Sequence, residues 1–414
     1  MVDFTLSPRQ EELRSIAKAF ALEVMIPSAE IADRETDPAN AFDWDVVREG
    51  SRRGLRTLTI PKEFGGEGAD VLTVSMVGEA LAYGDLGMAV AFDQTWKILT
   101  AITRVATKDQ RERWLPKIVD DDTFLMGICS TEPTAGSENI LPYQAPGAGM
   151  QLSAVRKGDV WVLNGTKRYI SNGGLAKLYM VRTRTDPDGP MATSLTSFLV
   201  PADAPGFRVT EVWDKLGQRC VQNGTLVFDN VEIPDIDRVG EVGNAAHIGT
   251  EFLLGYGSNI QAGATVLGVA QRAYDLSLQY AFEREQAGGP IINHQIQKTR
   301  LARMAMEIEA ARSYLWNAAW HAGREDQDPM HASLSKVFAS ETAAHVCKQA
   351  LELWAAAGYM RKNPLEKLFR DAHSFLHSDG TNDVLTLKAG NYLVATDPAD
   401  PVYSARTAEA AAGR

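Results

Sequence analysis

The hydrophobic pattern of this chain changes its period twice, and this change limits the folds that it can adopt. Apolar residues follow helical spacing up to about residue 122. From there to about residue 240, short β-type runs are separated by Asn-Gly, Asp-Gly and Pro-Gly turns. Helical periodicity then returns and continues to about residue 395. Helices, then strands, then helices predict an α+β protein of several domains.

The two helical sections carry local signals of their own. Ser7 is placed to cap a helix that begins at Pro8, and Gln10 completes a capping box. We expect this helical pattern to end at Pro27, because proline has no N–H to donate. In the C-terminal section, one face of a long predicted helix carries Leu301, Met304, Ile308, Ala311 and Leu315. A second long helix is predicted over residues 331–357, and such helices pack into a bundle.

The changes of period divide the chain into four expected parts. We predict an N-terminal helical domain over residues 1–122 and a central β-domain over residues 123–240. A helical bundle is predicted over residues 241–395, followed by a frayed tail over residues 396–414. The length of 414 residues agrees with two or three domains of ordinary size.

The composition excludes several classes of partner. The net charge of −11 argues against nucleic acid and against an anionic membrane surface. No apolar run is long enough to span a bilayer. The three cysteines, Cys129, Cys220 and Cys347, show neither metal-ligand spacing nor a disulfide framework. The cysteine spacing therefore predicts no metal site. The stretch Met1–Thr5 carries neither a basic nor an apolar leader, so we expect a cytoplasmic protein.

Three polar turns interrupt the predicted elements and could carry chemistry. Ser130–Ser137 supplies hydroxyls and exposed amides at the start of the β-domain, and Tyr169–Gly174 follows a predicted strand. His377–Thr381 places Asp379 beside a glycine between two helical segments, just after Leu365–Asp371. Either of the two β-domain turns alone is as well explained by an ordinary hairpin turn, since short motifs give false positives.

Together and in this order, the three turns resemble the acyl-CoA dehydrogenase family of flavoenzymes over roughly residues 5–393. The resemblance implies that family's fold: an N-terminal helical domain, a central β-barrel or sandwich, and a C-terminal four-helix bundle. It also implies FAD as the cofactor. The residues that match the family's cofactor contacts are Ile128, Ser130, Thr131, Gly136, Ser137, Tyr169, Ser171, Arg284, Gln295, Thr381 and Asp383.

The resemblance assigns Asp379 as the base that removes the α-proton of an acyl-CoA thioester. The family usually has glutamate there, so the arm of this base is one methylene shorter. Ser378 stands where the family has tyrosine, which leaves room for a bulky, branched or cyclic acyl group. The residues that match substrate contacts are Asp93, Ser137, Tyr256, Asn259, Ser378 and Gly380.

Several positions depart from the family pattern. Ala287 replaces an aromatic residue close to Arg284, and Asn259 replaces an arginine near the substrate. A Gln-x-x-Gly-Gly segment that approaches the FAD pyrophosphate of a neighbouring subunit reads Glu352, Ala355 and Ala356 at its matching positions. A carboxylate facing a pyrophosphate is repulsive unless it finds a cation. These departures bear on how tightly FAD binds.

Asp93 lies in an otherwise apolar helical stretch, and two interpretations of its role are open. Charged side chains are usually exposed, so we expect a solvated or helix-end residue first. The alternative is a second acid or base that reaches the far end of a cyclic acyl group, as in relatives that oxidise cyclic thioesters.

The resemblance predicts FAD-dependent dehydrogenation of an acyl-CoA in lipid degradation. It implies an electron-transfer flavoprotein as acceptor and a homo-tetramer or homo-dimer, with Arg284 and Gln295 reaching a neighbour's FAD. Two other functions stay open. The chain could be a weakly flavinated structural subunit of a hetero-oligomer, or it could eliminate a β-substituent from an acyl-CoA without oxidation.

Overall fold

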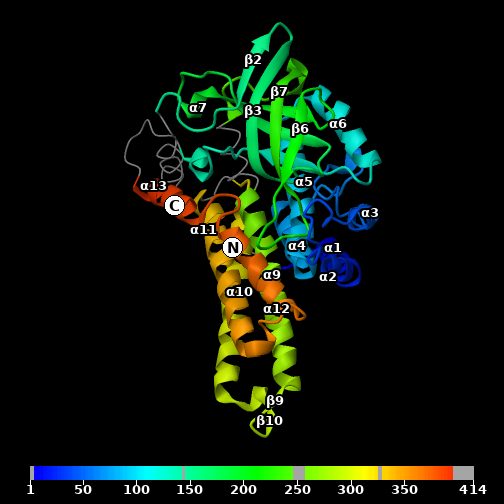
Figure 1. The fold of residues 1–414 in the computed structure, drawn as a ribbon, viewed down its shortest axis with the longest axis vertical. Helices are drawn as coiled ribbons and strands as arrows, with labels where there is room; N and C mark the ends of the chain where they lie inside the picture. The colour runs from blue at the N-terminus through cyan, green and yellow to red at the C-terminus, as the bar shows by residue number, and fades with distance from the viewer. Residues whose placement is uncertain (1–3, 142–144, 246–256, 325–328, 395–414) are drawn as a thin grey trace.

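The computed structural model describes residues 4–141, 145–245, 257–324 and 329–394. Helices fill the N-terminal section, strands the middle and helices the C-terminal section, so the predicted order is confirmed (Figure 1). The domain limits drawn at residues 122, 240 and 395 stay a proposal. The predicted tail lies outside the described residues.

The N-terminal section is helical. Its helices are α1 Pro8–Phe20, α2 Ile26–Ala32, α3 Trp44–Arg52, α4 Val71–Gly84, α5 Leu86–Val105 and α6 Lys108–Asp120. The capping box of Ser7 and Gln10 forms as predicted. The expected end at Pro27 is wrong. A π-turn over Ala21–Met25 changes the hydrogen-bond spacing, and Pro27 then lies in the first turn of α2, where no N–H is needed.

The middle section forms one sheet with strand order β6-β7-β3-β2-β4-β5-β8, and β1 pairs in parallel with β4. The strands are β1 Met126–Cys129, β2 Ser153–Lys157, β3 Val160–Ser171, β4 Leu178–Arg184, β5 Leu195–Pro201, β6 Phe207–Val212, β7 Asn223–Pro234 and β8 Arg238–Val239. A short helix, α7 Met191–Ser194, precedes β5. Buried side chains such as Trp161, Phe198 and Phe228 fill the sheet's core.

The C-terminal section is a helical bundle. Its helices are α9 Ser258–Glu283, α10 Gln295–His321, α11 Pro329–Trp354, α12 Pro364–Ala372 and α13 Asn382–Val394. A small hairpin of β9 Glu285–Gln286 and β10 Gly289–Pro290 joins α9 to α10. The predicted buried face of α10 is confirmed from Leu301 to Leu315.

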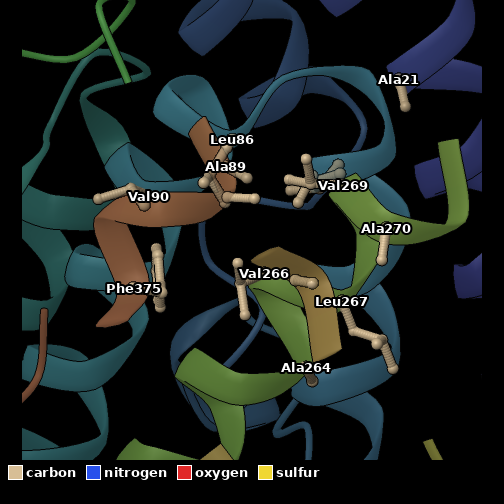
Figure 2. Close-up of a cluster of buried hydrophobic side chains, with 14 of the residues drawn as sticks. Ala21, Leu86, Ala89, Val90, Ala264, Val266, Leu267, Val269, Ala270 and Phe375 are labelled. Atoms are coloured by element: carbon tan, nitrogen blue, oxygen red, sulfur yellow. The ribbon is translucent and has the colours of Figure 1, made fainter. Parts of the chain in front are cut away.

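Helix α9 packs against both α4 and α11, so it joins the N-terminal helices to the bundle. The crossing with α4 is close because it is made by small residues. A Cβ added at Gly268 would lie 2.1 Å from the carbonyl oxygen of Glu79. Figure 2 shows the shared core, in which Val266 of α9 and Val90 of α5 lie near Phe375. This packing fixes α5, α9 and the segment after α12 relative to one another.

None of the helices in the described ranges is long and apolar enough to cross a membrane.

Candidate active site

The turn that carries Asp379 lies between a 3₁₀ turn at His373–Leu376 and α13. Asp379 has φ 54° and Gly380 φ 94°, both in the left-handed region. Aspartate tolerates this region better than most residues do. Asn259 of α9 donates its Nδ2 to the carbonyl oxygen of Asp379 over 2.9 Å, and Lys336 of α11 donates its Nζ to that of Gly380 over 2.9 Å. Two helices therefore fix the backbone of the turn.

A buried lysine joins Asp379 to Asp93, and we call these three residues the Lys97 cluster. The Nζ of Lys97 lies 2.7 Å from Oδ2 of Asp93 and 2.9 Å from Oδ2 of Asp379. Lys97 is 2% exposed and Asp93 is fully buried, whereas 19% of the Asp379 side chain is exposed. With all three groups ionised, the cluster carries a net charge of −1.

The expectation that Asp93 is solvated is wrong. It lies in the middle of α5 and not at a helix end, and α9 covers it. Gln261 of α9 donates to Oδ1 of Asp93 over 2.6 Å, which leaves Oδ2 for Lys97. Both oxygens of Asp93 therefore have protein partners, which is what allows a carboxylate to be buried.

Burial and charge act on the cluster in opposite directions. Burial raises the pKa of Asp93, the ammonium of Lys97 opposes this, and the net pKa is above the usual range. Burial alone would lower the pKa of Lys97, but Asp379 and Asp93 outweigh it and raise that pKa above its usual value. The lysine therefore stays charged between its two carboxylates.

The two oxygens of Asp379 differ. Oδ2 is held by Lys97, while Oδ1 receives no hydrogen bond from any residue in the described ranges. A carboxylate with one fixed and one uncommitted oxygen is oriented and can still accept a proton.

The first β-domain turn meets the turn of Asp379. The backbone N–H of Thr381 donates to Oγ of Ser137 over 3.0 Å, although 244 residues separate them. The structure thus brings two of the three predicted turns together. Ser130 and Thr131 precede Ser137 in the same loop, and their carbonyl oxygens accept from Lys167 and from the Arg168 N–H.

The second β-domain turn starts at an irregularity in β3. The register with β7 shifts between Lys167 and Ile170, and Tyr169 has φ 60° there. Tyr169 is 51% exposed, and the centroid of its ring lies 5.0 Å from that of Trp213. Ser171 accepts a hydrogen bond from Asn223 over 3.2 Å. Exposed aromatic surface and a hydroxyl therefore lie at the C-terminal end of β3.

Asn172 connects this turn to the rest of the site. It is fully buried and donates its Nδ2 to the carbonyl oxygens of Ala91 in α5 and Met126 in β1. Ala91 lies two residues before Asp93. The Tyr169 turn is thereby tied to the helix that carries the Lys97 cluster.

These groups fit FAD, the cofactor that the resemblance implies. The Tyr169 ring offers an apolar face, Ser171 offers a hydroxyl, and the loop from Ser130 to Ser137 offers amides and hydroxyls. Gly136 leaves this loop open, since an added Cβ would meet only Oε2 of Glu138, at 3.5 Å. Ile128 of β1 is half-buried below the loop, and Asp383 is exposed in the first turn of α13.

Two predicted cofactor residues lie elsewhere. Arg284 directly follows α9 and Gln295 begins α10, and both are exposed. They flank the β9–β10 hairpin, which lies at the opposite end of the molecule from the sheet (Figure 1). Ala287 lies in the same hairpin with φ 54°. The structure does not bring this pair to the chain's own Asp379, so their expected contact with a neighbour's FAD stays a prediction.

The carboxylate of Glu352 lies beside two cations. Its Oε1 lies 2.7 Å from Lys348 and its Oε2 lies 3.7 Å from Arg300, and the hydrogen bond from Lys348 lowers the pKa of Glu352. Ala355 and Ala356 follow it on the surface, and Ala355 has φ 51°. The charge of Glu352 is therefore locally compensated.

The remaining predicted substrate residues have varied surroundings. Tyr256 lies outside the described residues. Asn259 is fully buried and uses its Nδ2 to hold the Asp379 turn. Ser378 donates to the carbonyl oxygen of Ser374 over 2.9 Å, which keeps its small side chain against the preceding turn.

Sequence reasoning missed Lys97, Gln261 and Lys336. A local signal for Lys97 exists, because an acidic residue four positions before a lysine forms a pair on one helix face. Gln261 and Lys336 gave no such signal, since only the packing of α9 and α11 brings them to the site.

Comparisons with known proteins agree with this geometry. Three family models match: the acyl-CoA dehydrogenase N-terminal domain over residues 7–122, the middle domain over residues 127–231 and the C-terminal domain over residues 258–391. A probable acyl-CoA dehydrogenase, YngJ of Bacillus subtilis, is 30% identical and covers 95% of this chain and all of its own. A 3-sulfinopropanoyl-CoA desulfinase of Paraburkholderia xenovorans is 32% identical, covering 94% and 97%. The structure of butyryl-CoA dehydrogenase from Megasphaera elsdenii has a TM-score of 0.87 at 29% identity, covering 95% of this chain and all of that one.

Proposed function

Because the chain belongs to the acyl-CoA dehydrogenase family, we propose that Asp379 is the base that removes the α-proton of an acyl-CoA thioester. The protein is an FAD-dependent oxidoreductase acting on CH–CH bonds. When bound, FAD supplies the acceptor for the hydride that leaves the β-carbon.

The observation that carries the proposal is the uncommitted Oδ1 of Asp379. In the proposed step the Cα–H bond breaks and its proton goes to Oδ1, while Lys97 keeps hold of Oδ2. Lys97 thus orients the carboxylate throughout. Because an aspartate arm is short, the α-carbon has to lie close to the turn.

The surroundings of Asp379 also support a proposal for the substrate. The small Ser378 is bonded back towards Ser374, so we keep the proposal that the acyl group of the substrate is bulky, branched or cyclic. Ser137 and Gly380 are proposed contacts to the thioester end, beside the hydrogen bond from Thr381 to Ser137. We propose that Asp93 acts on Asp379 through Lys97 and does not contact the substrate, because both of its oxygens are already bonded within the protein.

We also retain the partners that the family implies. An electron-transfer flavoprotein is the proposed electron acceptor, and the proposed assembly is a homo-tetramer or homo-dimer in the cytoplasm, acting in lipid degradation. The exposed Arg284 and Gln295 would reach a neighbour's FAD in such an assembly.

Replacing the base tests the proposal. Asp379→Asn keeps the size of the side chain and its tolerance of the left-handed region, but it removes the basic oxygen. We expect flavin absorbance to be retained and α-proton exchange in D₂O to fall about 10²- to 10⁴-fold. Exchange is measured with butyryl-, isobutyryl- and cyclohexanecarboxyl-CoA.

The matched control is Asp229→Asn, which neutralises an exposed carboxylate on the sheet, paired with Arg208. It should leave exchange unchanged. Undiminished exchange in Asp379→Asn would refute the assignment of the base.

One relative favours a second function. The desulfinase named above acts, by its name, on a 3-sulfinopropanoyl thioester, so loss of a β-substituent without net oxidation is the alternative reaction. Under this alternative, product forms without an electron acceptor and thioester does not bleach the flavin. Bleaching by any thioester of the panel would favour dehydrogenation.

The structural-subunit alternative rests on Ala287 and Glu352. It predicts that the purified protein is colourless. Since Lys348 and Arg300 compensate Glu352, we expect flavin absorbance instead.

A further inference from the structure

We propose that Asp93 keeps Asp379 basic by neutralising the positive charge of Lys97. In this role Asp93 is a positioning residue: it touches no reacting atom but decides how strongly Lys97 holds the base. The inference rests on the proposed role of Asp379.

A charge count gives the reason. Before proton transfer the Lys97 cluster holds two carboxylates and one ammonium, a net charge of −1. When Asp379 takes up the α-proton, the cluster becomes neutral and the Lys97–Asp93 ion pair stays intact. Proton uptake thus removes an unbalanced charge from a site where charge is costly.

Without Asp93 the balance reverses. Lys97 and Asp379 alone would form a neutral pair, and protonation of Asp379 would leave a buried ammonium with no counter-charge. Lys97 would then favour the ionised form of Asp379 and make it a weaker base. A second carboxylate that shares the lysine offsets this effect on the base.

The geometry supports this sharing. Asp93 and Lys97 are four residues apart on α5, so one helix presents both. Gln261 holds Oδ1 of Asp93 from the opposite helix and leaves Oδ2 directed at Lys97. Lys97 is closer to the fully buried Asp93, at 2.7 Å, than to the partly exposed Asp379, at 2.9 Å. The raised pKa values of Asp93 and Lys97 agree with one strongly coupled site.

Other charged groups face the turn without touching the carboxylate of Asp379. Lys336 of α11 contacts the carbonyl oxygen of Gly380 and Oδ1 of Asn382. Glu341, also on α11, lies 3.5 Å from Nδ2 of Asn382. Beside the turn, His377 has a pKa lowered by burial and then by Lys336. These groups are present in every variant below, so their effect is constant.

The test measures α-proton exchange against pH, with the thioester of the panel that exchanges fastest. Asp93→Asn is nearly isosteric and removes only charge. We expect the acid limb of the profile to move to lower pH by about one unit and plateau exchange to fall about ten-fold. Asp93→Glu restores the charge and should bring the midpoint back towards the wild-type position.

Removing the lysine should act in the opposite direction. Lys97→Met leaves two facing carboxylates, so the acid limb should move to higher pH. The double variant, Asp93→Asn with Lys97→Met, leaves Asp379 without either neighbouring charge. Its midpoint should lie between those of the two single variants.

A merely structural role for Asp93 predicts something else: lower exchange in both single variants, with an unmoved midpoint and a still weaker double variant. That result would overturn the inference. Should Asp93→Asn not fold, Lys97→Met carries the same test with the opposite sign.

The Asp379→Asn variant separates this inference from the proposed function. If that variant keeps wild-type exchange, the base assignment fails and the inference with it. If it loses exchange while Asp93→Asn and Lys97→Met leave the midpoint unmoved, only the inference fails.

Discussion

Two buried clusters in this protein have the same composition and lie between the same parts of the chain. The Lys97 cluster joins α5 to the turn of Asp379. A second cluster, which we call the Lys367 cluster, joins Asp85 at the start of α5 to Lys367 and Asp371 of α12. Its ammonium lies 2.5 Å from Asp85 and 2.6 Å from Asp371. Each cluster has two aspartates and one lysine.

The two clusters differ in what else their carboxylates bind. Asp85 caps α5 by accepting from the Met88 N–H, and Asp371 accepts from the Gln218 N–H, so every carboxylate oxygen of the Lys367 cluster has a partner. Both aspartates there are fully buried, whereas Asp379 is partly exposed and its Oδ1 accepts no hydrogen bond from the part of the chain that the structure describes. Equal composition thus serves two ends. The saturated cluster joins parts of the fold, and the unsaturated one contains the carboxylate that we propose for proton transfer.

The largest expected effect separates the clusters by stability. Lys367→Met would remove the ammonium that binds both buried carboxylates directly, and we expect a loss of about 3–5 kcal/mol in the free energy of unfolding. Lys97→Met should cost less, about 1–3 kcal/mol, because Gln261 still binds Asp93 and Asp379 reaches solvent. Urea titration of the two variants measures both values. Equal losses of stability would contradict the distinction between the saturated and the unsaturated cluster.

A third buried lysine sharpens the comparison through pH. Among the described residues, Lys336 contacts a carbonyl and an amide oxygen but no carboxylate, and burial lowers its pKa to about 8. By contrast, Asp371 and Asp85 outweigh burial at Lys367 and raise its pKa well above the usual value. Like residues with unlike partners should therefore respond to pH in opposite directions.

For Lys336 the folded pKa lies below the unfolded value of 10.5, so the unfolded chain binds more protons between pH 8 and pH 10.5. The free energy of unfolding of the wild type should rise with pH across this window, relative to Lys336→Met, by up to about 3 kcal/mol. Denaturant titrations of both proteins at several pH values give the difference. A difference that is flat with pH would mean that Lys336 is not desolvated.

The smallest effect concerns the cost of a left-handed backbone. Asp379 takes φ 54° with contacts from α9 and α11, and Ala355 takes φ 51° on the surface. Ala355→Gly should stabilise the protein by about 0.5–1 kcal/mol, because glycine adopts this region without strain. The control Ala357→Gly, in the same 3₁₀ turn but at a position without positive φ, should destabilise it slightly. Thermal unfolding measures both, and no gain at Ala355 would mean that its left-handed backbone carries no strain.

Local patterns predicted most of the architecture. The capping box at Ser7, the buried face of α10 and the short β-type runs depend on near neighbours in sequence, so the sequence predicted all of them. The end expected at Pro27 failed because a π-turn is not encoded by apolar spacing.

The site was predictable only in part. Its turns could be recognised because glycine and polar residues interrupt regular elements. The contact between Lys97 and Asp379 spans 282 residues, and it depends on how α5 packs against the C-terminal segment. The burial of Asp93 was misjudged for the same reason, since its partner Gln261 comes from α9. Composition could not tell a saturated cluster from an unsaturated one.

The turn of Asp379 receives contacts from α5, α9, α11 and the β-domain loop at Ser137. Its orientation is thus shared among four distant stretches of sequence. Mutations that leave residue 379 unchanged could therefore alter how fast the proposed base works, or which thioester it reaches. Changes of activity in such a fold would come from mutations in the supporting helices, and a comparison restricted to catalytic positions would miss them.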